Sequence, residues 1–183
     1  MNRMSKAFYL GSIAGGLGLG ILVLLIAVVL MVSSGGRISE DEAALAIVPA
    51  ALFMFYGGIV MLVLWYKMWA AIQDGHARTT PGKAIGFMFI PFFNICWAFQ
   101  VIWGWAKDYN AYTARHGLAS APKIPEGLFL TYVVLCFTTW IPILGVLLMI
   151  ANFAIGLMMV SKVCDAVNAL PAGPAAAPTP AAA

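Results

Sequence analysis

The sequence predicts an all-α integral membrane protein with four transmembrane helices and a re-entrant or interfacial helical segment at about residues 82–106. Two observations lead to this fold class. The 183 residues are 63% hydrophobic and only 9% charged, whereas a soluble domain has about 25% charged residues. The chain also contains four long runs without any charge, and each exceeds the ~20 apolar residues that cross a bilayer. These runs are residues 7–36, 43–66, 84–106 and 127–161.

The first predicted helix covers about residues 7–32. Arg3 and Lys6 precede it, but its length and the lack of a small-residue cleavage site favour a retained helix over a signal peptide. Small residues recur along one face at four-residue spacing, which predicts a helix-packing face because small side chains let helix backbones approach closely in lipid. Packing within the chain and self-association both fit this pattern. The residues of this face are Gly11, Gly15, Gly16 and Gly20.

A second helix is predicted from Ser39 to about residue 73. Ser39 and Glu42 have the spacing of a capping box, and the acids at positions 40–42 suit the positive end of the helix dipole. They therefore predict a helix cap rather than a metal site. Aromatic and basic residues mark the end that leaves the bilayer, namely Trp65, Tyr66, Lys67 and Trp69. We expect His76, in the loop that follows, to be solvated.

The last uncharged run, residues 127–161, is too long for one straight span. As a helix, its 35 residues would measure about 52 Å. Pro142 and Gly145 lie near its middle, and a proline disrupts the helix that contains it. We therefore expect a hairpin of two helices, at about residues 125–141 and 144–168, with one kinked helix as the alternative. Asn152 is the polar core residue here, and we expect it to form an interhelical hydrogen bond, with the 90–94 turn as a candidate partner.

The chain is expected to form one helical membrane domain, residues 1–169, followed by an Ala/Pro-rich tail, residues 170–183. After Leu170 the tail has no charge and no large apolar residue. Such a segment cannot bury enough surface to fold. We therefore expect the tail to be disordered.

The distribution of charge decides how residues 84–106 meet the membrane. With the N-terminus in the cytoplasm, a single crossing by this segment divides the ten basic residues five and five between the two sides. If the segment enters and returns, nine lie inside and only Arg37 lies outside. The positive-inside rule prefers the second arrangement, which also places the C-terminus in the cytoplasm.

The predicted turn of the re-entrant segment contains Pro91 and Asn94. Proline breaks a helix, and the asparagine amide can serve the backbone groups that the break frees. Irregular backbone at membrane depth must be covered by protein or water, so we expect residues 90–94 to pack against the other helices. We also expect three tryptophans to anchor the segment at the level of the headgroups. These are Trp97, Trp103 and Trp105.

Residues 81–110 resemble a pattern found in uncharacterised bacterial multi-pass membrane proteins, whose families are described only as domains of unknown function. The resemblance covers about thirty residues. It implies a bacterial membrane protein, which we place in the cytoplasmic (inner) membrane, and it implies no activity. The matching residues are Pro81, Gly82, Lys83, Gly86, Ile90, Pro91, Phe92, Phe93, Asn94, Trp97, Phe99, Gly104, Lys107, Asp108 and Asn110.

Few residues in the sequence can support chemistry. The apolar run of each predicted span contains no Asp, Glu, Lys, Arg or His residue, although an enzyme needs titratable groups in a pocket. The basic residues are scattered singly, which gives no nucleic-acid footprint. The cysteines have no metal-ligand spacing and are expected to be packing residues: Cys96, Cys136 and Cys164. The sequence therefore predicts no catalytic residue, no metal and no cofactor.

These observations favour a non-catalytic membrane protein, an accessory, assembly or scaffold subunit that acts through helix packing. Its expected partners are the lipid bilayer and either another membrane protein or further copies of itself. One alternative is a small channel or transporter that uses the re-entrant segment. The other is a lipid-acting enzyme at the cytoplasmic face that uses His76, His116 or Asp108.

Overall fold

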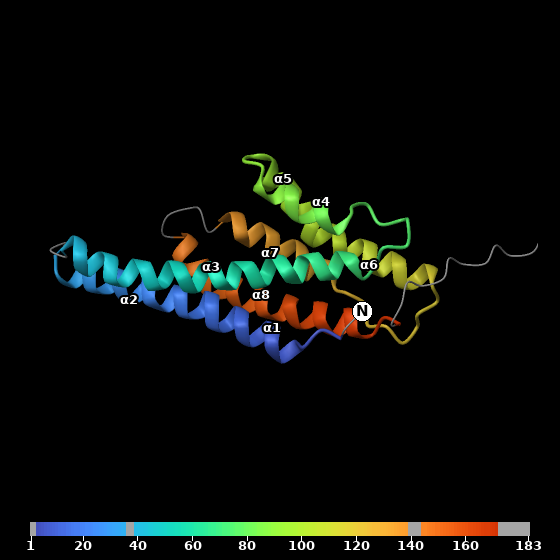
Figure 1. The fold of residues 1–183 in the computed structure, drawn as a ribbon, viewed down its shortest axis with the longest axis horizontal. Coiled ribbons are helices and arrows are strands. Elements are labelled where there is room, and N and C mark those ends of the chain that lie inside the picture. The colour runs from blue at the N-terminus through green and yellow to red at the C-terminus, as the bar shows by residue number, and fades with distance from the viewer. Residues whose placement is uncertain (1–2, 36–38, 139–143, 172–183) are drawn as a thin grey trace, which may run out of the picture. The chain divides into compact units, whose positions relative to one another are not determined.

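The computed structural model describes residues 3–35, 39–138 and 144–171, and these form helices joined by loops (Figure 1). They divide into two compact units, Ala7–Val63 and Met1–Lys6 with Leu64–Ala183. Three helices are long and apolar enough to cross a membrane: Lys6–Ser33, Ile47–Ala70 and Leu148–Asn168. The predicted all-helical class is therefore confirmed for the described residues, and three of the four predicted spans have the required length and composition.

The smaller unit contains the first long helix and most of the second. The first consists of α1 (Lys6–Ile13), the π-helical turn η1 (Ala14–Gly18) and α2 (Leu19–Ser33), and the second is α3 (Glu40–Ala70), which continues into the larger unit. The predicted capping box is present. The Glu42 backbone N–H donates to the Ser39 hydroxyl at 3.2 Å, and the Ser39 N–H donates to the Glu42 carboxylate at 3.0 Å.

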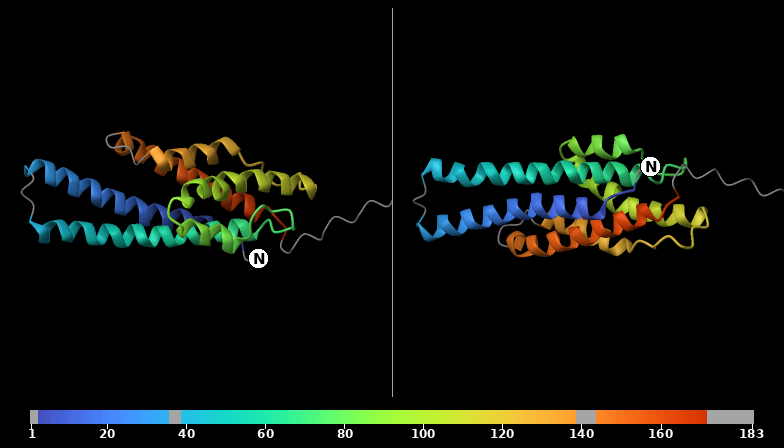
Figure 2. Two further views of the ribbon diagram at one scale, coloured as in Figure 1. Left: turned by 90° about the horizontal axis from the view of Figure 1, so that it is seen from above. Right: turned by 60° about the horizontal axis from the view of Figure 1, so that its bottom comes forward.

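The larger unit contains the remaining elements, which Figures 1 and 2 show from three directions. In chain order these are α4 (Pro81–Gly86), the 3₁₀ turn η2 (Phe87–Phe89), α5 (Phe93–Ala98), the π-helical turn η3 (Phe99–Trp103), α6 (Gly104–Arg115), α7 (Glu126–Thr138) and α8 (Leu144–Asn168). Two buried tryptophans connect the end of α3 to η3 and α6. Trp69 donates to the Val101 carbonyl at 3.0 Å, and Trp105 donates to the Met68 carbonyl at 2.7 Å.

The region that was predicted as a hairpin consists of two separate helices, α7 and α8, which pack against each other. A Cβ at Gly156 would lie 3.0 Å from the Tyr132 ring, and the Asn152 amide lies 3.7 Å from the Cys136 sulfur. In both helices, the contact between Gly156 and Tyr132 lies farther in sequence from the α7–α8 connection than the contact between Asn152 and Cys136. The two helices therefore run antiparallel. The Pro142 turn itself lies outside the described residues, as do Arg37 and residues 172–183 of the predicted tail.

Candidate functional site

Residues 81–115 form a helical hairpin in the larger unit. α4 and η2 lead to a break at residues 90–92, and the chain then returns through α5, η3 and α6 (Figures 1 and 2). The Thr80 hydroxyl accepts from the Lys83 N–H and caps α4, with Pro81 at the first helical position. Phe92 has a φ of 62°, which is unusual for a side chain of this size. This conformation lets the Asn94 N–H reach the Ile90 carbonyl at 3.0 Å, so α5 starts immediately after the break.

An aromatic cluster of Phe87, Phe93 and Trp97 joins the two legs of the hairpin. The Trp97 ring lies 5.0 Å from Phe87 on the first leg and 5.5 Å from Phe93 on the second, and the two phenylalanines lie 5.8 Å apart. The Trp97 N–H also donates to the Ala84 carbonyl at 3.1 Å. A pair of aromatic rings contributes about 1 kcal/mol beyond its buried area. The cluster therefore stabilises the reversal of the chain.

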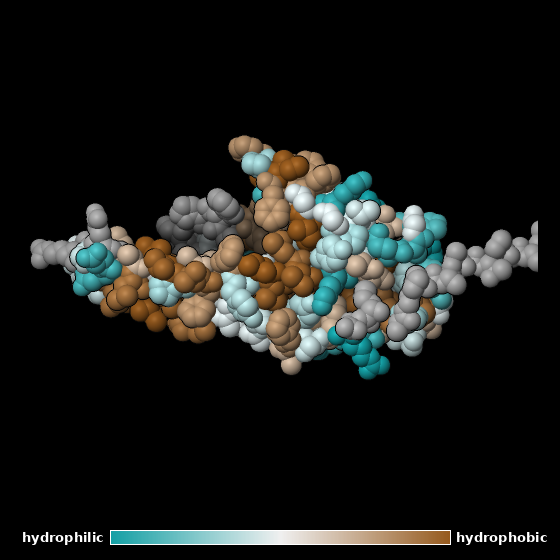
Figure 3. All heavy atoms as spheres, in the orientation of Figure 1, coloured by the Kyte–Doolittle hydropathy of each residue, from teal (hydrophilic) through white to brown (hydrophobic). Residues whose placement is uncertain are grey.

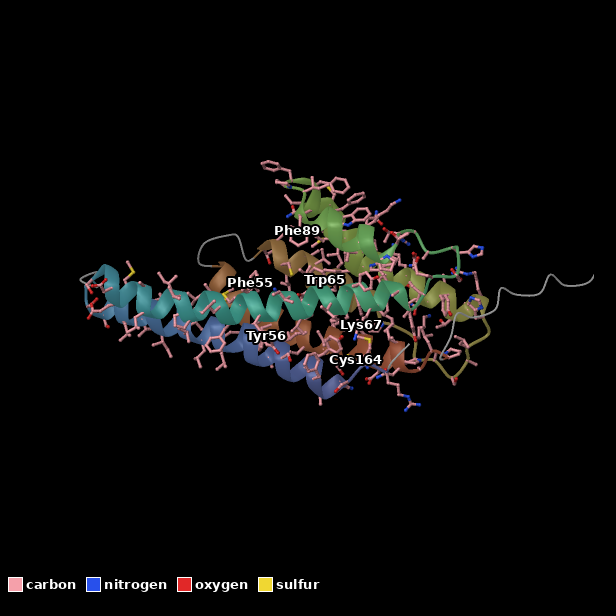
Figure 4. The ribbon with its side chains drawn as sticks, viewed as in Figure 1. Phe55, Tyr56, Trp65, Lys67, Phe89 and Cys164 are labelled. Carbon is pink, nitrogen blue, oxygen red and sulfur yellow. The ribbon has the colours of Figure 1, made fainter. Side chains whose placement is uncertain are left out.

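The tip of the hairpin, residues 89–95, exposes large apolar side chains. The exposed fraction is 87% for Phe92 and 69% for Phe89, and it exceeds two fifths for Ile90, Phe93 and Ile95. The tip forms a mainly hydrophobic projection in Figure 3, and Phe89 is labelled in Figure 4. The expectation that residues 90–94 pack against other helices is therefore wrong for the described structure. Phe93 contacts the aromatic cluster and is still exposed, and the other large side chains of the tip lie outside the cluster.

At the open end of the hairpin, Arg78 binds Asp108. The guanidinium and the carboxylate lie 2.6 Å apart, and the Arg78 backbone N–H donates to the same carboxylate at 2.9 Å. A second guanidinium nitrogen of Arg78 donates to Gln100 at 3.2 Å. A Cβ at Gly104 would lie 3.2 Å from the guanidinium, so glycine gives Arg78 the room to lie against α6. Together these contacts join the residues before α4 to η3 and α6.

A second charged cluster surrounds Asp74, whose side chain is only 6% exposed. It accepts from Arg115 at 2.8 Å, from the His76 backbone N–H at 2.9 Å, and lies 3.2 Å from the His116 ring. Burial alone would raise the pKa of Asp74, but these hydrogen bonds and the Arg115 charge outweigh it and lower the pKa to about 2. The carboxylate is therefore held in its charged form at neutral pH.

Further polar contacts connect α6 and α8 to other segments of the larger unit. Asn110 donates to the Ile124 carbonyl and to Glu126 at 3.0 Å each, which fixes the start of α7. The Tyr109 hydroxyl donates to the Ala166 carbonyl at 3.2 Å. At the end of α8, Lys6 pairs with Asp165 at 2.8 Å, and the Met4 N–H donates to Asn168 at 2.7 Å. Within the larger unit, α6 thus contacts the end of α8, and the end of α8 in turn binds residues 4–6.

The three predicted interface tryptophans have different surroundings. Trp97 belongs to the aromatic cluster, and the Trp103 ring lies 3.3 Å from the Lys107 ammonium group. Trp105 differs from the expectation, because its side chain is fully buried. Its ring lies 5.8 Å from Phe129, and its N–H is satisfied by the Met68 carbonyl. Protein therefore satisfies both the apolar ring and the polar atom that an interface anchor would present to lipid and water.

The two predicted polar residues, Asn94 and Asn152, are not partners. Asn152 contacts Cys136 between α7 and α8, which agrees with an interhelical role but not with the 90–94 turn as partner. Asn94 is half-buried, and its amide forms no hydrogen bond within the described part of the chain. The Asn94 side chain was expected to bind the backbone groups at the helix break. Instead, the backbone N–H groups of residues 93–95 donate to the backbone carbonyls of residues 90–92.

The predicted glycine face is divided between close contact and open space. A Cβ at Gly16 would lie 2.8 Å from the Gly57 nitrogen, and one at Gly20 would lie 3.1 Å from the Ala50 carbonyl, so α3 approaches both closely. A Cβ at Gly11 or Gly15 would meet nothing within 4 Å. The close approach therefore involves Gly16 and Gly20, and the other two glycines face outward from this contact.

The arrangement of ionisable groups has limited chemical capacity. Among residues 3–35, 39–138 and 144–171, no group of three or more His, Cys, Asp or Glu side chains could hold a metal ion. Of the three residues of the enzyme alternative, His76 and His116 both lie against Asp74, at 3.8 Å and 3.2 Å, while Asp108 is bound by Arg78. The His116 side chain is 8% exposed, which restricts its access to a substrate.

The sequence reasoning missed Asp74 and Arg78 as key residues. The available signal was their position: both lie in the loop just before the uncharged segment, while Asp108 and Arg115 lie just after it. No protein-family model, no curated protein and no solved structure matches this chain. The resemblance of residues 81–110 to uncharacterised bacterial membrane proteins therefore stays a prediction.

Proposed function

We propose that this protein is a non-catalytic, multi-pass membrane protein that serves as an accessory, assembly or scaffold subunit through helix packing. In this proposal the hairpin enters the membrane from the cytoplasmic side and returns to it. The observation that supports this most is the ion pair between Arg78 and Asp108. A segment that crossed a ~30 Å hydrocarbon core between these residues would hold them far apart.

The proposed topology places both chain termini in the cytoplasm of a bacterial cell, with the inner membrane as the site. Residues 4–6 and the end of α8 are joined by the Lys6–Asp165 pair and the Met4–Asn168 bond, which agrees with a shared side. As the fourth span we propose the helix predicted at about residues 125–141, of which the structure describes α7. Its 13 described residues measure only about 20 Å, and the rest of the predicted span lies outside the described residues.

Helix packing is proposed as the mode of action because the aspartates of the larger unit are bound by its own basic residues. Asp74, Asp108 and Asp165 are each paired with a basic residue. By contrast, large apolar side chains are exposed on the tip and along α2, where Val32 is 75% exposed. Large exposed apolar surfaces mark sites of contact with a membrane or with another protein. A partner helix or a second copy of this chain is therefore the expected ligand.

The proposed topology can be tested with single cysteines in a cysteine-free variant. A119C, in the exposed loop after α6, should react with a membrane-impermeant maleimide only from the cytoplasmic side. S34C, at the end of α2, is the matched control and should react only from outside. Labelling of A119C from outside would show that the segment crosses the membrane and would overturn the hairpin topology.

The proposed mode of action can be tested by photocrosslinking in native membranes. A photoreactive amino acid at Phe92 or at Val32, both highly exposed, should yield adducts with a partner protein or with a second copy. The same probe at the buried Trp105 is the control and should yield no intermolecular adduct. A chain that remains monomeric and forms only lipid adducts at both exposed positions would contradict a scaffold function.

A further inference from the structure

We infer that the hairpin binds anionic phospholipid headgroups through Lys83 and Lys107, and that this contact fixes the depth of the hairpin. The inference rests on the proposed function, since it requires the tip to enter the bilayer. The larger unit has nine Lys or Arg residues against four Asp or Glu residues, a net charge of +5. This excess of positive charge needs anions from outside the unit.

The four acids of the larger unit already have partners. Asp74 accepts from Arg115, Asp108 from Arg78, and Asp165 from Lys6. The fourth acid, Glu126, accepts from the Asn110 amide. The excess positive charge is therefore carried by Arg3 and by lysines outside these pairs.

Lys83 and Lys107 are the two such lysines on the legs of the hairpin. Neither forms an ion pair with an acid in the part of the chain that the structure describes, and Lys83 is exposed. Lys107 lies next to Asp108 in sequence, and its ammonium group lies over the Trp103 ring at 3.3 Å. A cation–π contact of this kind orients the ammonium group without neutralising its charge.

The arrangement along the hairpin matches the layers of a lipid leaflet. The tip exposes Phe89, Ile90 and Phe92, which suit acyl chains. Lys83 and Lys107 lie on the legs away from the tip, and Trp103 is of the residue type that favours the headgroup region. A soluble anion would satisfy only the lysines. A phospholipid with a net negative headgroup satisfies the lysines and the tip together, so we assign the site to lipid.

The test measures binding of brominated phosphatidylglycerol and brominated phosphatidylcholine to the full chain in zwitterionic detergent, by quenching of tryptophan fluorescence. A lysine near an anionic surface contributes about fivefold in affinity. We therefore expect K83Q/K107Q to lose about 25-fold in affinity for phosphatidylglycerol and to bind phosphatidylcholine as the wild type does. K83R/K107R keeps the charge and should keep the preference, which separates loss of charge from misfolding.

Two controls make the result decisive. K123Q/K162Q removes the same charge from other elements of the larger unit and should change the affinity less than threefold. Inorganic phosphate should not compete with the lipid. The inference is overturned if the wild type shows no preference for phosphatidylglycerol, if the two double variants lose affinity equally, or if phosphate competes. Maleimide labelling of A119C in intact cells separates the failures: cytoplasmic labelling without a lipid preference removes only this inference, whereas external labelling removes the proposed hairpin topology.

Discussion

Arg78 and Asp108 form an ion pair 2.6 Å long, although the uncharged residues 84–106 lie between them in the sequence. The Asp108 side chain is 12% exposed and that of Arg78 is 38% exposed, so the pair is partly shielded from water. The backbone N–H of Arg78 binds the same carboxylate. This pair joins the two legs of the hairpin at its open end, and the aromatic cluster joins them nearer the tip.

Replacement of Arg78 by alanine should therefore destabilise the larger unit. Hydrogen bonds to charged groups contribute about 1.5–3 kcal/mol, and we expect R78A to lower the melting temperature in detergent by about 5 °C. R78K keeps the charge but loses the two-point contact, so its melting temperature should lie between those of R78A and the wild type. The exchanged pair R78D/D108R should recover part of the loss. Equal stability of R78A and the wild type would show that the pair does not stabilise the hairpin.

The close contact at Gly16 gives a second prediction, with Gly15 as its matched control. A Cβ at Gly16 would lie within 3 Å of backbone atoms of Gly57 and Phe53, which cannot rotate away. Overpacking costs about 1–3 kcal/mol, so G16A should lower the melting temperature. A Cβ at Gly15 meets open space, and G15A should leave the temperature equal or slightly raised. If the two variants behave alike, the approach of α1–α2 to α3 is looser than described.

The positions of the long helices and of the helix break were predictable from the sequence. The uncharged runs located the long helices, and the Ser39–Glu42 spacing located the start of α3, because both signals are local. The break at residues 90–92 was also predictable, since an interior proline removes a backbone hydrogen bond and clashes with the preceding turn, although α3 continues through Pro49. These features need no knowledge of what the helices touch.

The surroundings of individual side chains were not predictable in the same way. Nothing in the sequence distinguishes Trp105, which is buried, from Trp103, which binds Lys107, because the difference arises from the direction each residue faces on the helix. The partner of Asn152 depends on the antiparallel register of α7 and α8, which sets Cys136 opposite it. The partner of Asp74 is 41 residues away in sequence, and only the return of the hairpin brings Arg115 to it.

The antiparallel register of α7 and α8 can be tested by disulfide formation. Cys136 contacts Asn152 across the two helices, so N152C should crosslink with Cys136 upon mild oxidation once Cys96 and Cys164 have been replaced by alanine. I150C is the control, because Ile150 is 68% exposed and should not crosslink within the monomer. A faster-migrating band on non-reducing gels reports the bond. A single kinked helix would keep the two positions apart, and no bond would form with N152C.

The stability of the larger unit should depend on pH through Asp74. Its pKa is lowered to about 2 from an ordinary value of 3.8 by Arg115 and its other hydrogen-bond donors, against the effect of burial. A group whose pKa is lower in the folded state binds its proton less readily there, so its stabilisation is complete above about pH 4 and is lost as the pH falls towards 2. The loss should amount to about 2 kcal/mol. Melting curves of the wild type in detergent, measured from about pH 6 down to about pH 2, should show this decline in stability.

The matched variant for this prediction is D74N, which keeps the shape of the side chain and cannot be charged. At neutral pH it should melt at a lower temperature than the wild type, because Arg115 loses its partner. Since D74N has already lost the stabilisation that acid removes, the difference between the two proteins should shrink as the pH falls from about 4 to about 2. A D74A variant would add the loss of the His76 backbone bond and should be less stable than D74N at every pH. A constant difference between D74N and the wild type across this range would mean that Asp74 keeps its ordinary pKa in the folded protein.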